Sequence, residues 1–407
     1  MNGYISIFLI QLINPFIGFV KGLMSFDTKW SKTMIFLFLC FYSYTFIPIP
    51  NSDAAKYETR IERYEPVNFN EYITNIVNMY SIDSEFKDAY IDTVFYLLGS
   101  FTNNPRVYRL VYGMVYYAVL LSFLSAMRRT TFAGDKLYLL GLGMLYAISS
   151  GINGVRWPLA LMTYLTGIAF YIERLDVKYL LLCALSIFIH FSLIFMVPFL
   201  LIYLLLRKSY KSGMYILYLL IIAFFVLNID FEQQKNILGY GLEDATSGYV
   251  SNNTFKEGRA NHLKSLNWYV VFNRFSTYYF GLGVVLFSIV FKRKIVKTDR
   301  AIRLELLALL FYFGSFISAS FLDVLSNRYY LLANAISLMY CYVLSAKNKE
   351  LPLLRVLRRI YVPILLVNIA LILRADSYTF SPILFFGNWL TTAIDIVEVN
   401  MYELLNW

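Results

Sequence analysis

The sequence predicts an all-α polytopic membrane protein with about 12 transmembrane helices, arranged as a single transmembrane domain over residues 1–407. Two observations predict this class. Hydrophobic residues make up 59% of the chain and charged residues 15%, whereas a soluble domain carries about 25% charged residues. The apolar residues also form runs of about 15 to 25 between basic clusters, the length that crosses a ~30 Å hydrocarbon core. These features exclude a soluble enzyme, a disordered protein and a disulfide scaffold.

The apolar runs define the candidate spans in order along the chain. The run 177–206 needs interpretation, because a single helix of that length would extend about 45 Å at 1.5 Å per residue. Two short helices that reverse direction at His190-Phe191-Ser192 fit a bilayer better. The twelve predicted spans are 2–20, 33–50, 107–126, 137–150, 156–172, 177–190, 192–206, 213–229, 267–291, 301–322, 325–345 and 359–374.

Basic residues indicate the side of the membrane on which each connection lies. Six clusters hold 22 of the 36 Lys and Arg residues but only seven of the 26 acidic residues. The positive-inside rule therefore places all six in the cytoplasm, which requires that 177–206 crosses the membrane twice and leaves both termini outside. The clusters are 21–32, 127–136, 173–178, 207–212, 292–305 and 346–359.

The net charge of +10 follows mainly from this topology. It does not indicate nucleic-acid binding, which needs basic residues interleaved with aromatic residues on one exposed surface. The cytoplasmic loops are too short for a catalytic domain, whereas three outer segments are long: 51–106, 230–266 and the tail 375–407. We therefore expect any chemistry at the outer face. The alternative is that these segments are structural caps.

Charged residues inside or beside an apolar span are costly, so they mark candidate sites. Arg156 ends the segment Gly151-Ile152-Asn153-Gly154-Val155-Arg156, and Pro158 fits the first turn of the helix that follows. Glycines that permit close backbone approach, free helix N–H groups and a guanidinium would then converge, a combination that suits a phosphate. The alternative is an arginine whose side chain extends to the lipid headgroups.

Two further arginines lie at the outer ends of other spans. Arg274 would lie ~10 Å along the helix that begins near Asn267, too deep to reach the headgroups easily, so it should face a polar cavity, an anion or a structural ion pair. Arg328 opens the next-but-one span, with Ser326 or Asn327 as the helix cap and a local salt bridge to Asp323 as the alternative. Arginines from three helices predict a shared anion at membrane depth, and a lipid-linked pyrophosphate satisfies that description.

Three residues are candidates for a catalytic base: His190, Asp53 and Asp323. We expect His190 at the tip of the helical hairpin, and an unperturbed imidazole is largely neutral at pH 7 and ready to accept a proton. Asp53 is better suited to orienting a sugar hydroxyl, and Asp323 would be neutralised by Arg328. The alternatives are that His190 only packs in the interior and that Asp53 is only a solvated loop residue.

The sequence contains no nucleotide-binding glycine motif, zinc spacing, calcium loop or nucleophile elbow. Cys40, Cys183 and Cys341 lie inside apolar runs, which is typical of small buried residues rather than of a redox or zinc site. We therefore expect no cofactor and no metal.

Several of these segments also carry a resemblance to a known family. Ser52-Asp53-Ala54-Ala55-Lys56-Tyr57, the segment Gly151 to Arg156, His190-Phe191-Ser192 and Asn273-Arg274-Phe275-Ser276-Thr277-Tyr278-Tyr279-Phe280 resemble the EpsG/Wzy group of exopolysaccharide and O-antigen polymerases, with Arg328-Tyr329-Tyr330 as a looser match. The likeness covers about residues 50 to 345. Trp157 departs from the polar residue expected after the arginine.

The resemblance implies a metal-independent glycosyltransferase with a GT-C-like fold in the bacterial inner (plasma) membrane. Its active site would face the periplasm or exterior and join undecaprenyl-pyrophosphate-linked oligosaccharides into a polymer. Arg156, Arg274 and Arg328 would bind the pyrophosphate leaving group. The expected partners are the lipid-linked oligosaccharide, membrane lipid and a chain-length regulator protein, and no nucleic acid.

Two other functions remain open at this stage. An O-antigen-ligase-like transferase would move a finished glycan to another acceptor, with a similar site. A lipid-linked oligosaccharide flippase would show related halves and charges in a cavity open to both sides, whereas the candidate charges here lie on the outer half only.

Overall fold

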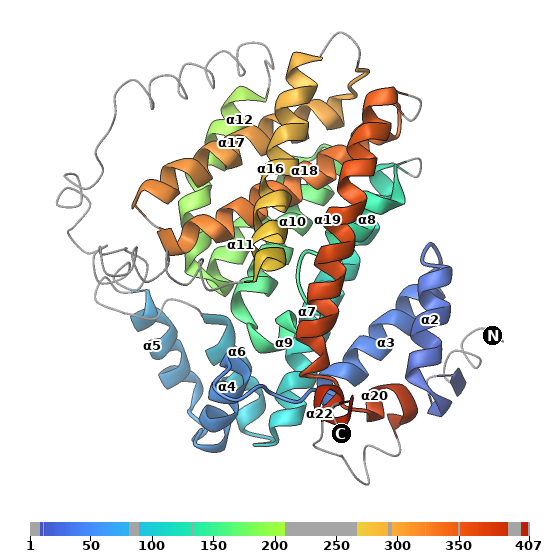
Figure 1. Cartoon of the computed structure of the whole chain (residues 1–407). Coiled ribbons are helices and arrows are strands. Elements are labelled where there is room, and N and C mark those ends of the chain that lie inside the picture. Colours follow the sequence, from blue (N-terminus) through green and yellow to red (C-terminus); the bar gives the residue numbers. More distant parts are fainter. Residues whose placement is uncertain are drawn as a thin grey trace.

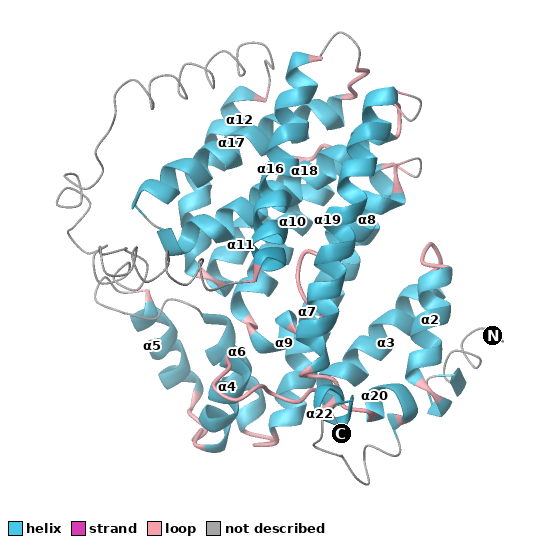
Figure 2. Cartoon of the chain, viewed as in Figure 1, coloured by secondary structure: helices cyan, strands magenta, loops and turns pink. Residues whose placement is uncertain are grey.

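The computed structural model describes residues 9–10, 12–80, 89–131, 134–207, 267–291, 295–321, 323–348, 351–389 and 400–405. All regular elements in these ranges are helices, as the sequence predicts (Figure 2). The predicted span 213–229 and the predicted outer segment 230–266 lie outside the described residues.

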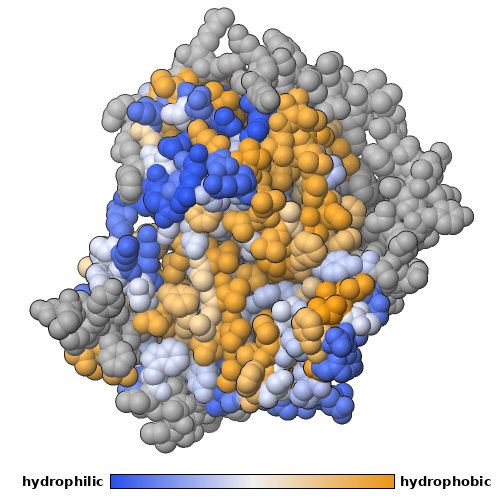
Figure 3. Space-filling view, turned by 180° about the vertical axis from the view of Figure 1, so that it is seen from behind, coloured by the Kyte–Doolittle hydropathy of each residue, from blue (hydrophilic) through white to orange (hydrophobic). Residues whose placement is uncertain are grey.

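Among the residues that the structure describes, four helices are long and apolar enough to cross a membrane: α7 (Pro105–Thr130), α16 (Trp268–Val290), α17 (Asp299–Phe321) and α19 (Pro352–Ser377). Figure 3 shows a broad hydrophobic surface across the middle and upper right of one face, with hydrophilic residues gathered at its upper left and along its lower right edge. These features support a multi-pass membrane protein, whereas the count of twelve spans stays a prediction.

The helix α10 (Arg156–Arg174) forms the centre of the bundle. Fifteen of its 19 residues are buried, so α10 faces other helices rather than lipid. It packs against α7 and α11, while α17 packs against α18. Besides three short helices in the segment 51–106, the further helices are α2 (Pro15–Met24), α3 (Lys29–Thr45), α8 (Lys136–Gly143), α9 (Ser150–Asn153), α11 (Leu181–Ile189), α12 (Val197–Leu206), α18 (Asp323–Ser345), α20 (Ile383–Phe386) and α22 (Met401–Leu405), with the 3-10 turns η1 (Val177–Leu180) and η2 (Phe191–Met196).

The predicted reversal at His190-Phe191-Ser192 is confirmed by contacts along α10. At one end of this helix the rings of Trp157 and His190 are 5.6 Å apart. At its other end the hydroxyls of Tyr171 and Tyr203 are 2.7 Å apart, 14 residues or ~21 Å further along the axis. The chain therefore runs down α11 and returns through α12 to the end from which it came.

The predicted span 137–150 is wrong as a continuous helix. The helix α8 has eight residues, about 12 Å of rise, and the chain then leaves helical geometry before the four-residue α9. The physical reason lies in another helix, because the Asp376 carboxylate accepts hydrogen bonds from the backbone N–H groups of Ile148 and Ser149 at 3.0 Å each. These N–H groups are thereby satisfied without a helical partner.

The predicted start of the span 325–345 also changes. The helix α18 begins at Asp323, so Ser326 and Asn327 lie inside it and do not cap it. Arg328 consequently belongs to the second turn of α18 rather than to its first.

Ion pairs join the basic clusters at one end of the bundle. Arg128 binds Asp27 through two hydrogen bonds of 2.7 and 3.0 Å and holds the pKa of that carboxylate below its usual range. Two further ion pairs join Arg129 to Glu173 and Arg358 to Asp135. Arg300 also donates hydrogen bonds to the backbone carbonyls of Thr130 and Glu173. These contacts connect five of the six clusters, as a shared side of the membrane requires.

The segment 51–106 forms three short helices, α4 (Asp53–Glu62), α5 (Phe69–Met79) and α6 (Ala89–Gly99). Figure 1 shows them gathered at one end of the bundle, on the same side as α20 and α22, while the ends of α7, α16 and α18 that carry the basic clusters lie opposite. The described parts of the predicted outer segments thus share one end.

Cysteine labelling tests the orientation of these two ends. In Lys56→Cys, on α4, a membrane-impermeant maleimide added to intact cells is expected to react, because the native side chain is 71% exposed. In Lys178→Cys, 65% exposed at the opposite end, reaction should require permeabilised cells. The three native cysteines are buried and give little background. Labelling of Lys178→Cys from outside, with protection of Lys56→Cys, would reverse the predicted topology.

Candidate functional site

The turn between α11 and η2 presents His190 to the second turn of α18. His190 has extended backbone angles (φ −148°, ψ 109°), which end α11, and its side chain is buried. Its Nδ1 lies 3.1 Å from the Ser192 hydroxyl and its Nε2 lies 3.1 Å from a guanidinium nitrogen of Arg328. The two residues come from segments 138 positions apart in the chain.

The chemistry of these partners selects one form of the imidazole. Arginine has only donors, so Nε2 of His190 must accept from Arg328 and carries no proton. We assign the proton to Nδ1, which then donates to the Ser192 hydroxyl at 3.1 Å, a shorter contact than the one with the Ser192 backbone N–H at 3.4 Å. A doubly protonated ring would place two donors and two positive charges against each other. The pair therefore fits a neutral histidine.

Trp157 is the residue on which this cluster packs. The His190 ring meets the indole edge-on, at an interplanar angle of 89°. The Arg328 guanidinium lies over the indole with its Cζ 5.2 Å from the ring centre, a cation–π contact. The indole N–H donates to the hydroxyl of Tyr146. Trp157 thereby contacts both His190 and Arg328. Sequence reasoning missed this role, because it treated the tryptophan only as a departure from a family pattern.

Tyr329 fixes the register between α18 and the histidine turn. Its hydroxyl donates to the carbonyl of Ser192 at 2.7 Å, and its side chain is fully buried. Because Tyr329 follows Arg328 directly, this bond restrains the backbone that carries the guanidinium.

Arg156 completes the group. It is the first residue of α10 and immediately precedes Trp157, which contacts both His190 and Arg328. The structure thus brings together three of the predicted site residues, Arg156, His190 and Arg328.

The other three predicted residues are placed differently. Asp53 opens α4, its side chain is 53% exposed and its nearest described cation is Lys56 at 3.9 Å. Its neighbour Ala54 donates its N–H to the Asn153 side chain at 3.5 Å, so α4 contacts the turn before Arg156. The side chains of Arg274 and Asp323 lie outside the described part of the structure.

A partly polar cavity lies beside Asn273 on α16. Asn273, one position before Arg274, lines this cavity of about 230 Å³ together with Asn334 and Asn368. Asn273 donates to Asn368 at 3.2 Å, and both amide atoms of the fully buried Asn334 lack a partner among the described protein atoms. An interior of this kind has room for several water molecules.

Asp376, near the end of α19, is a second residue that sequence reasoning missed. It is fully buried and accepts both backbone bonds from Ile148 and Ser149, so it anchors the segment that leads into the arginine turn. A signal was present, since an aspartate at the end of an apolar helix is as costly as the arginines. It lies two residues beyond the predicted span 359–374, although α19 continues to Ser377.

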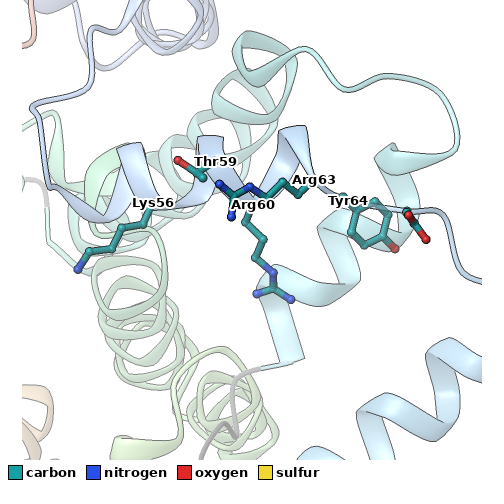
Figure 4. A pocket seen from close by; sticks show the side chains of 6 residues that line it. Lys56, Thr59, Arg60, Arg63 and Tyr64 are labelled. Atoms are coloured by element: carbon teal, nitrogen blue, oxygen red, sulfur yellow. The ribbon is translucent and has the colours of Figure 1, made fainter.

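A separate cavity, lined by basic residues, lies on α4 and does not include the histidine turn. It is open, has a volume of about 390 Å³ and is lined by Lys56, Thr59, Arg60, Arg63, Tyr64 and Glu65 (Figure 4). Arg60 is held by Asp92 and lies over the Phe95 ring with its Cζ 4.7 Å from the centre. This cavity supplies basic residues that serve as controls for the buried site.

Arg109, near the start of α7, is a buried basic residue. Its side chain is 10% exposed and forms an ion pair with Glu58, which joins α7 to α4. Removing either partner of a buried ion pair destabilises the protein. An Arg109 variant is therefore a poor control for the candidate site residues Arg156 and Arg328.

The two glycines before Arg156 differ in their need for space. A Cβ on Gly151 would lie 2.1 Å from the ring of Tyr116, whereas a Cβ on Gly154 would meet nothing closer than 3.5 Å. We expect Gly151→Ala to lower the free energy of unfolding by about 1–3 kcal/mol through overpacking, while Gly154→Ala is tolerated. Thermal unfolding of both purified variants checks this, and equal stability would contradict the close packing of the turn.

Comparison with known proteins gives one match of this chain to a family. The EpsG family model matches residues 33–384, which include all six predicted site residues. No curated protein and no solved structure matches.

Proposed function

The chain belongs to the EpsG family, and from this premise we propose that it polymerises lipid-linked oligosaccharide repeat units at the outer face of a bacterial plasma membrane. The proposed substrates are undecaprenyl-pyrophosphate-linked oligosaccharides, one as donor of the growing chain and one as acceptor. Family membership supports a polysaccharide polymerase role in general terms, and the residues of the candidate site support the finer assignment.

One observation carries this proposal: Arg328 and His190 meet on Trp157, which directly follows Arg156 at the start of α10. Arg328 is half-buried and held by His190 and Trp157, and Arg156 is half-buried beside them. Cations in such a partly buried site stabilise negative charge more strongly than they do in water. A pyrophosphate leaving group develops negative charge on its departing oxygen, and guanidinium groups bind such oxygens through paired hydrogen bonds.

The proposed reaction exchanges one bond of the donor sugar for another. The anomeric carbon loses its bond to the pyrophosphate oxygen, which leaves with the electron pair, and gains a bond to the acceptor hydroxyl oxygen. The proton of that hydroxyl passes to Nε2 of His190. Charged phosphate oxygens are stronger acceptors for Arg328 than a neutral imidazole is, so donor binding would draw Arg328 from His190 and expose Nε2 to the acceptor.

Cells that lack this protein test the function. A polymerase predicts that the surface glycan stops at a single repeat unit on its lipid carrier, measured by mass spectrometry of extracted lipids. A ligase predicts that full-length polymer accumulates on the carrier. A flippase predicts that no repeat unit is displayed outside, and either of these two results would contradict the proposal.

A further inference from the structure

An apolar groove runs along α7 towards the candidate site. It has a volume of about 390 Å³ and lies between α2, α3, α7 and α8. Its lining is mainly aliphatic and aromatic, including Leu120, Leu124 and Leu140. Along α7 it extends from Tyr116 to Arg128, about 18 Å at 1.5 Å per residue. This is more than half of a ~30 Å hydrocarbon core.

The outer end of this groove adjoins the arginine turn. Tyr146 lines the groove and accepts the indole N–H of Trp157, on which Arg328 is packed. Tyr117, also in the lining, donates its hydroxyl to the carbonyl of Ile148 at 2.8 Å. A chain attached to a phosphate at Arg156 and Arg328 would therefore enter the groove directly.

The inner end of the groove carries charges of both signs. Its Arg128 is bound to Asp27 through two hydrogen bonds of 2.7 and 3.0 Å, and the Asp27 carboxylate and Lys136 also line the groove. At the outer end, Tyr146 connects the groove to Trp157, on which Arg328 packs. This continuity with the candidate site favours a ligand whose phosphate lies at the outer end and whose hydrocarbon runs inward.

We propose that this groove binds the polyprenyl chain of the lipid-linked donor, with its pyrophosphate at Arg156 and Arg328. The inference rests on the proposed function for the identity of the carrier. Gly143 offers a way to fill the groove, because a Cβ there would meet only Leu124, at 3.6 Å. Gly143→Phe therefore adds a ring to the groove without a backbone clash, and Val115→Trp, at a 37% exposed position of α7 outside the lining, is the matched control.

The experiment uses the purified full-length protein in lipid nanodiscs and compares donors with a long polyprenyl chain and with a chain of two isoprene units. We expect Gly143→Phe to lower turnover of the long-chain donor about tenfold, because part of the chain loses its apolar contact. Turnover of the short-chain donor should stay within about twofold of wild type, and Val115→Trp should change neither. Equal loss with both donors, or no loss, would overturn the inference.

A binding measurement separates this inference from the proposed function. A polyprenyl pyrophosphate with a photoreactive group on its chain is expected to label peptides of α7 and α8, and unlabelled polyprenyl pyrophosphate should compete. Competition by phosphatidylglycerol to the same degree, or labelling elsewhere, would overturn the groove assignment. Groove labelling without polymer formation by the wild type would retain the binding site and reject the polymerase function.

Discussion

Arg328→Ala is expected to lower polymer formation by roughly 100-fold, the effect of removing one fixed donor from a developing negative charge. Arg328 donates to His190 at 3.1 Å and lies over Trp157, so its guanidinium is already held in the site before substrate arrives. Preorganisation of this kind is what makes a donor effective in a site of low dielectric constant. The measurement is polymer length and amount from purified lipid-linked repeat units.

Two conservative variants distinguish shape from charge at this position. Arg328→Lys keeps the charge but loses the planar fork and the stacking on Trp157, so it should also lose most activity. Arg63→Lys, in the exposed basic cavity of α4, should remain active. If Arg328→Lys were as active as Arg63→Lys, a phosphate site at Arg328 would have to be abandoned.

His190→Ala is expected to suppress turnover by at least about 100-fold, as loss of a general base typically does, while binding of the donor lipid persists. Arg328→Ala, in contrast, should weaken donor binding as well as turnover. Donor binding to each purified variant, measured beside polymer formation, checks this contrast.

His190→Gln separates a base from a residue that only positions Arg328. The Gln side-chain oxygen can accept the Arg328 hydrogen bond, but it cannot take a proton at neutral pH. A catalytic base predicts that His190→Gln is as inactive as His190→Ala. Recovery of turnover in His190→Gln would show that the histidine only positions Arg328, and Asp53 would then be the next candidate for the base.

The sequence was least informative where a distant residue determines the local backbone. The predicted span 137–150 is apolar throughout, yet the chain leaves the helix because Asp376 binds two of its N–H groups. Hydropathy cannot reveal this partner, since the two segments are 227 and 228 positions apart in the chain. The pairing of Arg109 with Glu58, 51 positions away, is likewise hidden from any analysis of single segments.

The sequence by itself determined the helical membrane class, the sharing of one end by the basic clusters and the reversal at His190. These features depend on segment length, apolar content and charge, which are properties of each segment measured against a bilayer of known thickness. Only the tertiary structure decided that His190, Arg328 and Trp157 meet. Such contacts depend on the rotation and register of α10, α11 and α18 against one another, and those follow from side-chain packing over the whole interior.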